Sequence, residues 1–475
     1  MSEPKTIVKN TTVLLASELV NKALSFALAI AIARLLDVQG FGQYSFVFAF
    51  LGLFAIIQDF GLSTYVVRQL SRFPGQTQEL FSNYFTLKLV FSLMTFVIAS
   101  LAARFFVDSS SVMLAVMVVA FGMIFYNLSS VFGSVFQSRE QMEKMAYVSM
   151  LERILTTGLG IGLLLNGKGL LGLMLAFLVS YTSMFILSLI LGIRFVRPTL
   201  GFSLPLWKDM LKSSMLFWFY GLFQTIHFRT DTVMLKFLST YTAVGIYGVA
   251  HNILDALYFI PFAIISAVFP PMAKFFLKDK NSLRILYREA MHYLLMLGIP
   301  MAFGITLVAP RLIVFIYSDS FIQSGLALQI LIWSELFIFL AVATGFMLNS
   351  INREKYFAIY TALAALVNIV LNFILIPGYG FVGASIATVI SQGMLFILLL
   401  WEGYRHGFGI NVVKLASRPL AAALVMSAVI LALRQFHLAV ILSAAVFSYF
   451  AVLYLIKGIG AREISLFMQL FNRGK

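Results

Sequence analysis

Long apolar runs alternate along the chain with short connections that contain charged residues, proline and glycine. A helix needs roughly 20 predominantly apolar residues to cross a bilayer, and most of these runs are about that long. The runs lie at 11–35, 41–67, 81–107, 111–137, 146–166, 169–193, 209–238, 243–273, 284–309, 324–350, 355–376, 380–403, 416–433 and 438–457. The pattern predicts an all-α polytopic membrane protein with about 14 transmembrane helices.

The composition excludes several other classes of protein. Apolar residues make up 61% of the 475 residues and charged residues only 11%, whereas soluble domains are roughly 45–50% apolar and about a quarter charged. The absence of cysteine rules out disulfides, thiolate metal sites and a cysteine nucleophile. The five histidines are too scattered to form a metal-ligand pattern, so the sequence predicts neither a metal nor another cofactor.

The formal charge of +15 is mostly a topology signal. With the N-terminus placed inside, 24 of the 34 lysines and arginines lie on the cytoplasmic side, 6 on the other side and 4 within spans. This asymmetry predicts a multi-pass protein of the plasma (inner) membrane with both termini cytoplasmic. Basic loops then contact anionic lipids and give no reason to expect nucleic acid. The first run reads as a retained helix, and the tail at 457–475 as an amphipathic helix at the membrane surface.

Two sequence echoes indicate an internal repeat. The segment from Gly167 (GKGLLGLMLAFLVS) matches the segment from Gly378 (GYGFVGASIATVIS) at an offset of 211, and FGQYS at 41–45 matches VGIYG at 244–248 at an offset of 203. Six helices separate the copies, so both cross the membrane in the same direction, as in parallel repeats related by an axis along the membrane normal.

The repeat predicts two six-helix lobes around a central cavity. We expect an N-terminal lobe at 1–193, a cytoplasmic linker at 194–208, a C-terminal lobe at 209–403, and two extra transmembrane helices with a cytoplasmic tail at 404–475. The repeated glycines fit a nucleotide-binding fingerprint only superficially, because they do not stand between a strand and a helix. Tight turns and close helix packing explain them better.

Four stretches resemble the multidrug/oligosaccharidyl-lipid/polysaccharide exporter superfamily, in its polysaccharide-flippase branch. They are ARLLDVQGFGQYS (33–45), DFGLSTYVVRQLSR (59–72), RTDTVMLKFLSTYTAVGIYGVA (229–250) and NIVLNFILIPGYGFVGASIATVIS (368–391). The resemblance covers residues 10–403. It implies two six-helix lobes that form a V-shaped cavity opening alternately to either side.

The resemblance implies a transporter that flips a polyprenyl-diphosphate-linked oligosaccharide from the cytoplasmic to the outer leaflet, for example for O-antigen biosynthesis. Its partners would be that glycan, membrane lipids and polysaccharide polymerase or ligase machinery. Fourteen helices are typical of the glycan-lipid flippases, and twelve of the drug exporters. The alternative is a cation-coupled multidrug exporter of the same superfamily. A membrane-embedded enzyme is disfavoured because the longest loop, 194–208, contains no acidic residue.

Ionisable residues inside spans are candidates for function, because each costs at least ~2.5 kcal/mol at mid-membrane. Glu18 and Lys22 lie four residues apart in the first span. They form either a structural ion pair or, for Lys22, a contact to a lipid diphosphate of the kind that cationic cavity residues make in similar flippases.

The seventh and eighth spans carry polar stripes on helices expected to border the cavity. Gln224 and Asp231 share one stripe, and His251 and Asp255 share the other. The last two are either a core pair or a proton relay. Asp231 is a further candidate for proton coupling, and Gln224 is a candidate to contact the cargo. Arg229 is the best single candidate to anchor phosphate, because a guanidinium offers it two parallel hydrogen bonds.

The remaining candidates are isolated in sequence. Asp59 and Glu335 lie deep in their spans and are candidates for ion or proton coupling. Lys88 and Arg153 lie nearer the cytoplasmic face, where we expect them to snorkel. The arginines at the ends of cavity helices, Arg34 and Arg68, either meet a substrate headgroup or are solvated in loops.

Overall fold

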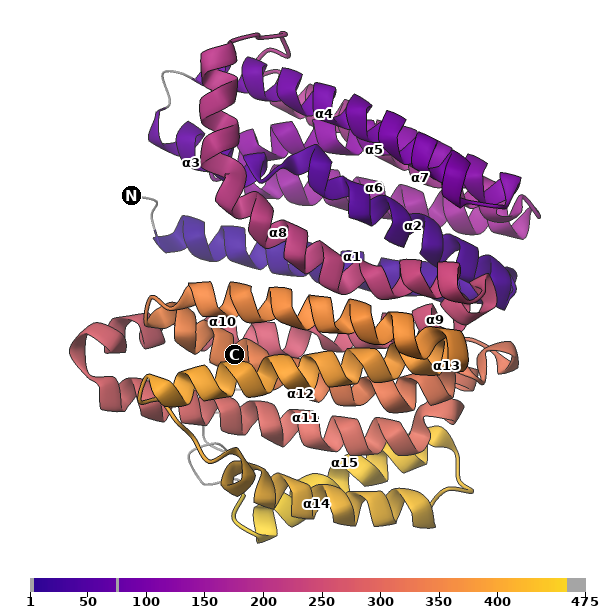
Figure 1. Ribbon diagram of the computed structural model, residues 1–475, viewed down its shortest axis with the longest axis vertical. Helices are drawn as coiled ribbons and strands as arrows, with labels where there is room; N and C mark the ends of the chain where they lie inside the picture. The colour runs from indigo at the N-terminus through magenta and orange to yellow at the C-terminus, as the bar shows by residue number, and fades with distance from the viewer. Residues whose placement is uncertain (1–3, 74–76, 459–475) are drawn as a thin grey trace. The chain divides into compact units, whose positions relative to one another are not determined.

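The computed structural model describes residues 4–73 and 77–458, with a helical fold in two compact units, Met1–Gly248 and Val249–Lys475 (Figure 1). The expected surface helix at 457–475 lies almost wholly outside the described residues.

The first unit contains α1 (Pro4–Leu35), α2 (Val38–Asp59), α3 (Leu62–Arg72), α4 (Thr77–Phe106), α5 (Ser110–Ser138), α6 (Met142–Leu165), α7 (Gly169–Gly192) and α8 (Leu204–Leu238). Helix α9 (Tyr241–Leu257) crosses the boundary between the units. The second unit contains α10 (Phe259–Lys278), α11 (Lys280–Ile316), the 3-10 turn η2 (Asp319–Phe321), α12 (Ser324–Ser350), α13 (Glu354–Arg405), α14 (Val412–Ala432) and α15 (Leu438–Leu455).

The described helices account for fourteen crossings. Twelve segments are long and apolar enough to span a membrane. One of them, α13, has 52 residues, or about 78 Å at 1.5 Å per residue, and it bends at Gly380, so it supplies two spans. Helix α8, with 35 residues, is long enough for one more. This confirms the all-α, multi-pass architecture expected from the hydrophobic pattern.

The connection between α7 and α8 is bound to α4. The side chain of Gln78 donates to the carbonyl of Arg197 (2.8 Å) and accepts from its amide (2.9 Å), while Asn83 accepts from the amide of Ser203 (2.8 Å). Helix α8 then packs against α2 and α3. The first compact unit therefore includes α8 and extends to Gly248, beyond the lobe boundary expected at 193. The boundary at 193 is inferred from the internal repeat and not from packing, so it stays a prediction.

One pair of the repeated glycines shares an unusual backbone angle. Gly169 and Gly380, which are equivalent at the offset of 211, both have positive φ, 57° and 54°. This conformation is open to glycine but strained for most other residues. Gly172 and Gly383 are also equivalent, and a Cβ at either position would overlap neighbouring residues of the same connection.

The second echo places two equivalent glycines against each other. A Cβ on Gly42 of α2 would collide with the carbonyl of Tyr241, and a Cβ on Gly245 of α9 would collide with the carbonyl of Val38. Tyr241 is the equivalent of Val38 at the offset of 203, so the contact is reciprocal, as at a two-fold axis. The helices can approach this closely only because both residues lack a side chain.

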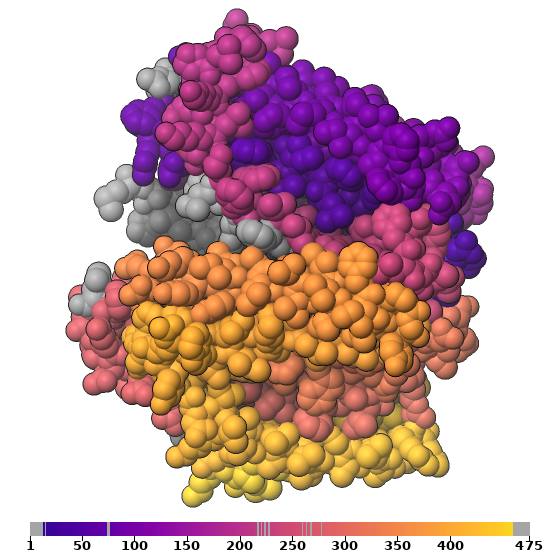
Figure 2. Space-filling view, viewed as in Figure 1, coloured from indigo at the N-terminus to yellow at the C-terminus, as the bar shows by residue number. Residues whose placement is uncertain are grey.

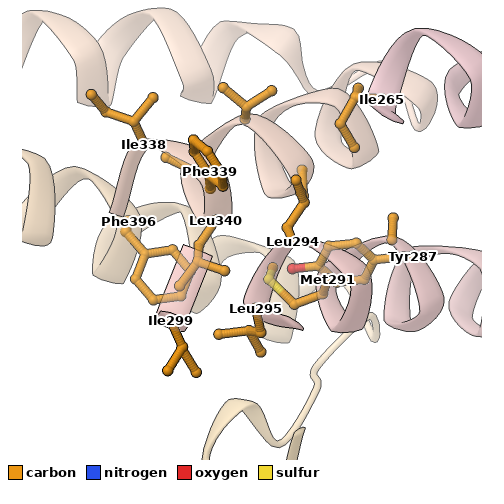
Figure 3. Close-up of a cluster of buried hydrophobic side chains, with 14 of the residues drawn as sticks. Ile265, Tyr287, Met291, Leu294, Leu295, Ile299, Ile338, Phe339, Leu340 and Phe396 are labelled. Carbon is orange, nitrogen blue, oxygen red and sulfur yellow. The ribbon is translucent and has the colours of Figure 1, made fainter. Parts of the chain in front are cut away.

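The core of the second unit lies among α11, α12 and α13. Leu294, Phe339 and Phe396 are part of this cluster (Figure 3), and the hydroxyls of Tyr287 and Thr344 are hydrogen-bonded inside it (3.0 Å). Helix α14 packs on α11, and α15 packs on α14. Residues of these last two helices form an edge of the second unit in the space-filling view (Figure 2).

Candidate functional site

Arg229 lies on the face of α8 that packs against α2. Its stem lies over Gly52, where an added Cβ would come within 3.4 Å of the arginine Cγ and Nε. Tyr44, two turns from Gly52 on the same face of α2, is within range of electrostatic interaction with Arg229. The side chain is exposed, and no acidic group among the described residues forms an ion pair with it. The guanidinium is therefore available to an anionic ligand.

Helix α1 is attached to α6 beside Lys22. Asn21 donates a hydrogen bond to Ser149 of α6 (3.2 Å), which sets the register of the two helices. Lys22 and Glu18 are both exposed, one turn apart on α1.

Helix α6 carries a buried acid–base pair, Glu152 and Arg153, which are neighbours in the sequence. Glu152 is only 5% exposed, accepts a hydrogen bond from Thr156 (2.9 Å), and lies 3.5 Å from a terminal nitrogen of Arg153. The Arg153 side chain is 29% exposed and pairs with this buried carboxylate. Its expected snorkelling stays a prediction.

Lys88 and Asp59 form the second internal ion pair of the first unit. Lys88 is 1% exposed and its Nζ lies 2.6 Å from an Asp59 carboxylate oxygen. Ser63 also donates to Asp59. The expected snorkelling of Lys88 is therefore wrong. The pair lies at the junction of α2 and α3, where Phe60 and Gly61 have positive φ and interrupt the helix.

Asp231 of α8 is also buried and bonded. It is 5% exposed and accepts a hydrogen bond from the Tyr247 hydroxyl of α9 (2.9 Å). Gln224, expected on the same stripe, has a side chain outside the described set. Arg34 and Arg68 are exposed at the ends of α1 and α3, and Arg68 lies over the ring of Tyr65.

The second unit contains a separate group of ionisable side chains. Glu335 of α12 is 6% exposed, and one of its carboxylate oxygens makes no hydrogen bond to any described residue. It is within electrostatic range of His251 and Asp255 on α9, whose side chains lie 3.5 Å apart. Among the described residues, no cluster of three acidic or histidine side chains is suited to hold a metal ion.

An apolar groove of about 350 Å³ runs between α11, α14 and α15. Met296, Pro300, Gly304, Met426, Tyr449 and Phe450 are among its lining residues. The groove offers hydrocarbon contacts and almost no polar groups.

Family models match this chain in two places. A family described as polysaccharide biosynthesis protein matches residues 7–276, more than half of the chain. The MatE family matches residues 218–374.

Two curated proteins of Haloferax volcanii are similar to the chain. One, described as probable low-salt glycan biosynthesis flippase Agl15, is 24% identical over 77% of each chain. The other, described as probable flippase AglR, is 28% identical over 44% of each chain.

Solved structures share the fold. The structure titled lipid II flippase MurJ, inward closed conformation, superposes with a TM-score of 0.79 at 16% identity, covering 93% of this chain and 98% of that one. An inward-facing multidrug resistance MATE family transporter superposes with a TM-score of 0.64 at 18% identity, covering 84% and 96%. At these identities the likeness is one of fold.

Proposed function

The chain belongs to the polysaccharide biosynthesis protein family, and from this premise we propose that it flips a polyprenyl-diphosphate-linked oligosaccharide from the cytoplasmic to the outer leaflet. Transport proceeds by alternating access and serves the synthesis of surface polysaccharide. The similarity to proteins described as glycan biosynthesis flippase and lipid II flippase supports this cargo. The chain acts as a transporter and not as an enzyme.

The proposal is carried by Arg229 of the first unit, which is exposed and forms no ion pair with any described acidic residue, in a protein of this family. A diphosphate carries negative charge that must be compensated away from bulk water, and a guanidinium does this with two charge-assisted hydrogen bonds. Lys22 is the second cation that we assign to the headgroup. The cargo would contact three further residues as it enters or leaves the cavity: Arg34, Arg68 and Gln224.

The groove between α11, α14 and α15 suits the polyprenyl chain. Its apolar lining would replace lipid around the part of the tail nearest the headgroup. The resemblance to glycan-lipid flippases likewise implies that the last two helices hold the polyprenyl tail.

We assign energy coupling first to Glu335, His251 and Asp255. Glu335 is buried and incompletely hydrogen-bonded, so a proton or a small cation can satisfy it. Asp59 and Asp231 already have hydrogen-bond donors in the first unit and are weaker candidates, as is the exposed Glu18.

A cation-coupled multidrug exporter is the second candidate, because the MatE family matches residues 218–374. An exporter of organic cations would be expected to use unpaired acids near its aromatic groups. In the first unit, Glu152 and Asp59 are instead paired with Arg153 and Lys88. This pairing favours the anionic cargo.

The protein's location and partners follow from the same proposal. We place it in the plasma membrane with both termini cytoplasmic, where the lysine and arginine asymmetry puts them. The flipped product would be consumed by a polymerase or ligase on the outer face.

The test is a flipping assay in proteoliposomes with a fluorescent polyprenyl-diphosphate-linked oligosaccharide. Wild-type protein should expose the lipid to an external quencher, Arg229→Ala should lower the rate at least tenfold, and Arg229→Lys should retain an intermediate rate. Arg434→Ala, a change at an exposed loop arginine, is the matched control. No flipping by wild type, together with gradient-driven uptake of an organic cation, would replace the flippase with the exporter.

A further inference from the structure

Three tyrosines from three helices of the first unit form an arc with one phenylalanine. Tyr126 of α5 and Tyr181 of α7 have ring centroids 5.1 Å apart, Tyr181 lies 5.9 Å from Phe177, and Phe177 lies 6.4 Å from Tyr44 of α2. The rings are tilted and not stacked, an arrangement that aromatic pairs commonly adopt.

The phenol groups of this arc are accessible. Tyr126 is 43% exposed, and Tyr44 and Tyr181 are half-buried. Their hydroxyls make no hydrogen bond to any described residue, whereas the buried Tyr65 of the same unit donates to Asp209 (2.8 Å). An accessible phenol offers a ligand both a polar group and an apolar ring.

The charged residues beside the arc are Glu152 and Arg153. Both lie within electrostatic range of Tyr44, Tyr126 and Tyr181. The Nε of Arg153 is buried and makes no hydrogen bond to any described residue. Because Glu152 balances the charge of Arg153, the pair offers directed donors and acceptors without a strong net field.

This combination fits a sugar better than the other parts of the proposed cargo. A pyranose presents C–H faces that pack on aromatic rings, and hydroxyls that bond to phenols, carboxylates and guanidinium groups. A polyprenyl chain would leave the polar groups unsatisfied. A phosphate would favour a cation that has no acidic partner among the described residues. Arg229 is such a cation, and Arg153 is not.

We propose that Tyr44, Tyr126, Tyr181 and the Glu152–Arg153 pair form a subsite for the first sugar of the lipid-linked glycan. Tyr44 and Gly52, over which Arg229 lies, are on the same face of α2, so this face connects the subsite with the assigned diphosphate anchor, as the first sugar is joined to the diphosphate. This inference rests on the proposed flippase function.

The test compares two ligands on purified full-length protein in nanodiscs. One is farnesyl diphosphate, and the other is farnesyl diphosphate carrying one sugar, chosen as the tightest binder among glucose, galactose and N-acetylglucosamine. The double variant Tyr126→Phe/Tyr181→Phe keeps the rings and removes two hydroxyls. Tyr147→Phe, at a tyrosine that is 60% exposed on α6, is the matched control.

The double variant should bind the sugar-bearing ligand about tenfold more weakly and the sugar-free ligand as tightly as wild type does. Arg229→Gln should weaken both ligands. The subsite is overturned if wild type gains nothing from the sugar, if the double variant binds both ligands like wild type, or if it loses tetraphenylphosphonium binding instead. Failure of wild type to bind either diphosphate would overturn the flippase proposal itself.

Discussion

Removing either partner of the Asp59–Lys88 pair should have unequal consequences. Lys88 is 1% exposed, whereas the Asp59 side chain is 41% exposed. Asp59→Asn leaves a buried ammonium with only weak acceptors, of which Ser130 is 3.5 Å away. Lys88→Met leaves a carboxylate that still accepts from Ser63 and can reach water.

The expected magnitudes follow from burial. Breaking a fully buried pair costs about 3–5 kcal/mol, so we expect about 3 kcal/mol for Asp59→Asn. For Lys88→Met we expect about 1 kcal/mol, because the exposed carboxylate retains much of its solvation. The double variant replaces the pair with neutral groups and should recover most of the loss, since removing both charges is often close to neutral.

The assay is thermal unfolding in detergent, followed by intrinsic tryptophan fluorescence. Tm should fall in the order wild type, Lys88→Met, Asp59→Asn, with the double variant above Asp59→Asn. The non-additivity gives the coupling between the two residues. Equal losses for the single variants, or a double variant at the sum of both, would refute the claim that the unpaired buried lysine dominates.

Three further predictions use other parts of the structure. Gly42→Val and Gly245→Val should each destabilise the protein by about 1–3 kcal/mol, whereas Gly133→Val, where an added Cβ meets nothing within 4 Å, should not; equal Tm values for all three would contradict the close contact. Glu335→Gln should abolish transport that is driven by an ion gradient, while flipping down the lipid's own concentration gradient continues. If transport driven by the ion gradient is unchanged, Glu335 does not take part in energy coupling. Gly304→Trp should fill the groove of α11, α14 and α15, and it should slow the flipping of long-chain lipids more than the flipping of farnesyl analogues. An equal effect on both lipids would show that the groove does not bind the polyprenyl tail.

The candidate site shows where sequence reasoning stops. Arg229 could be selected in advance, because a lone arginine deep in an apolar run is expensive there and needs a reason. Lys88 looked equally isolated, yet its partner Asp59 lies 29 residues away on another helix. Hydropathy gives a residue's approximate depth in the membrane but not the direction in which its helix faces.

The tyrosine arc was beyond sequence reasoning for a related reason. Tyr44, Tyr126 and Tyr181 are spread over 137 positions and stand among many other aromatic residues. Only the packing of α5 against α7, and of α2 near them, separates these tyrosines from those that contact lipid.

The sequence by itself determined the features that depend on local composition and backbone conformation. Membrane insertion depends on apolar runs of about 20 residues, so the fourteen spans could be read directly. The turns at Gly169 and Gly380 could be foreseen, because positive φ favours glycine at each position independently of its neighbours. The tertiary structure alone decided which helices contact one another. Helix α8 packs within the first unit, Lys88 pairs with Asp59 on another helix, and α14 lines the apolar groove. Lipid is as apolar as most helix surfaces, so hydrophobicity does not choose partners within a membrane; close packing and a few polar contacts do.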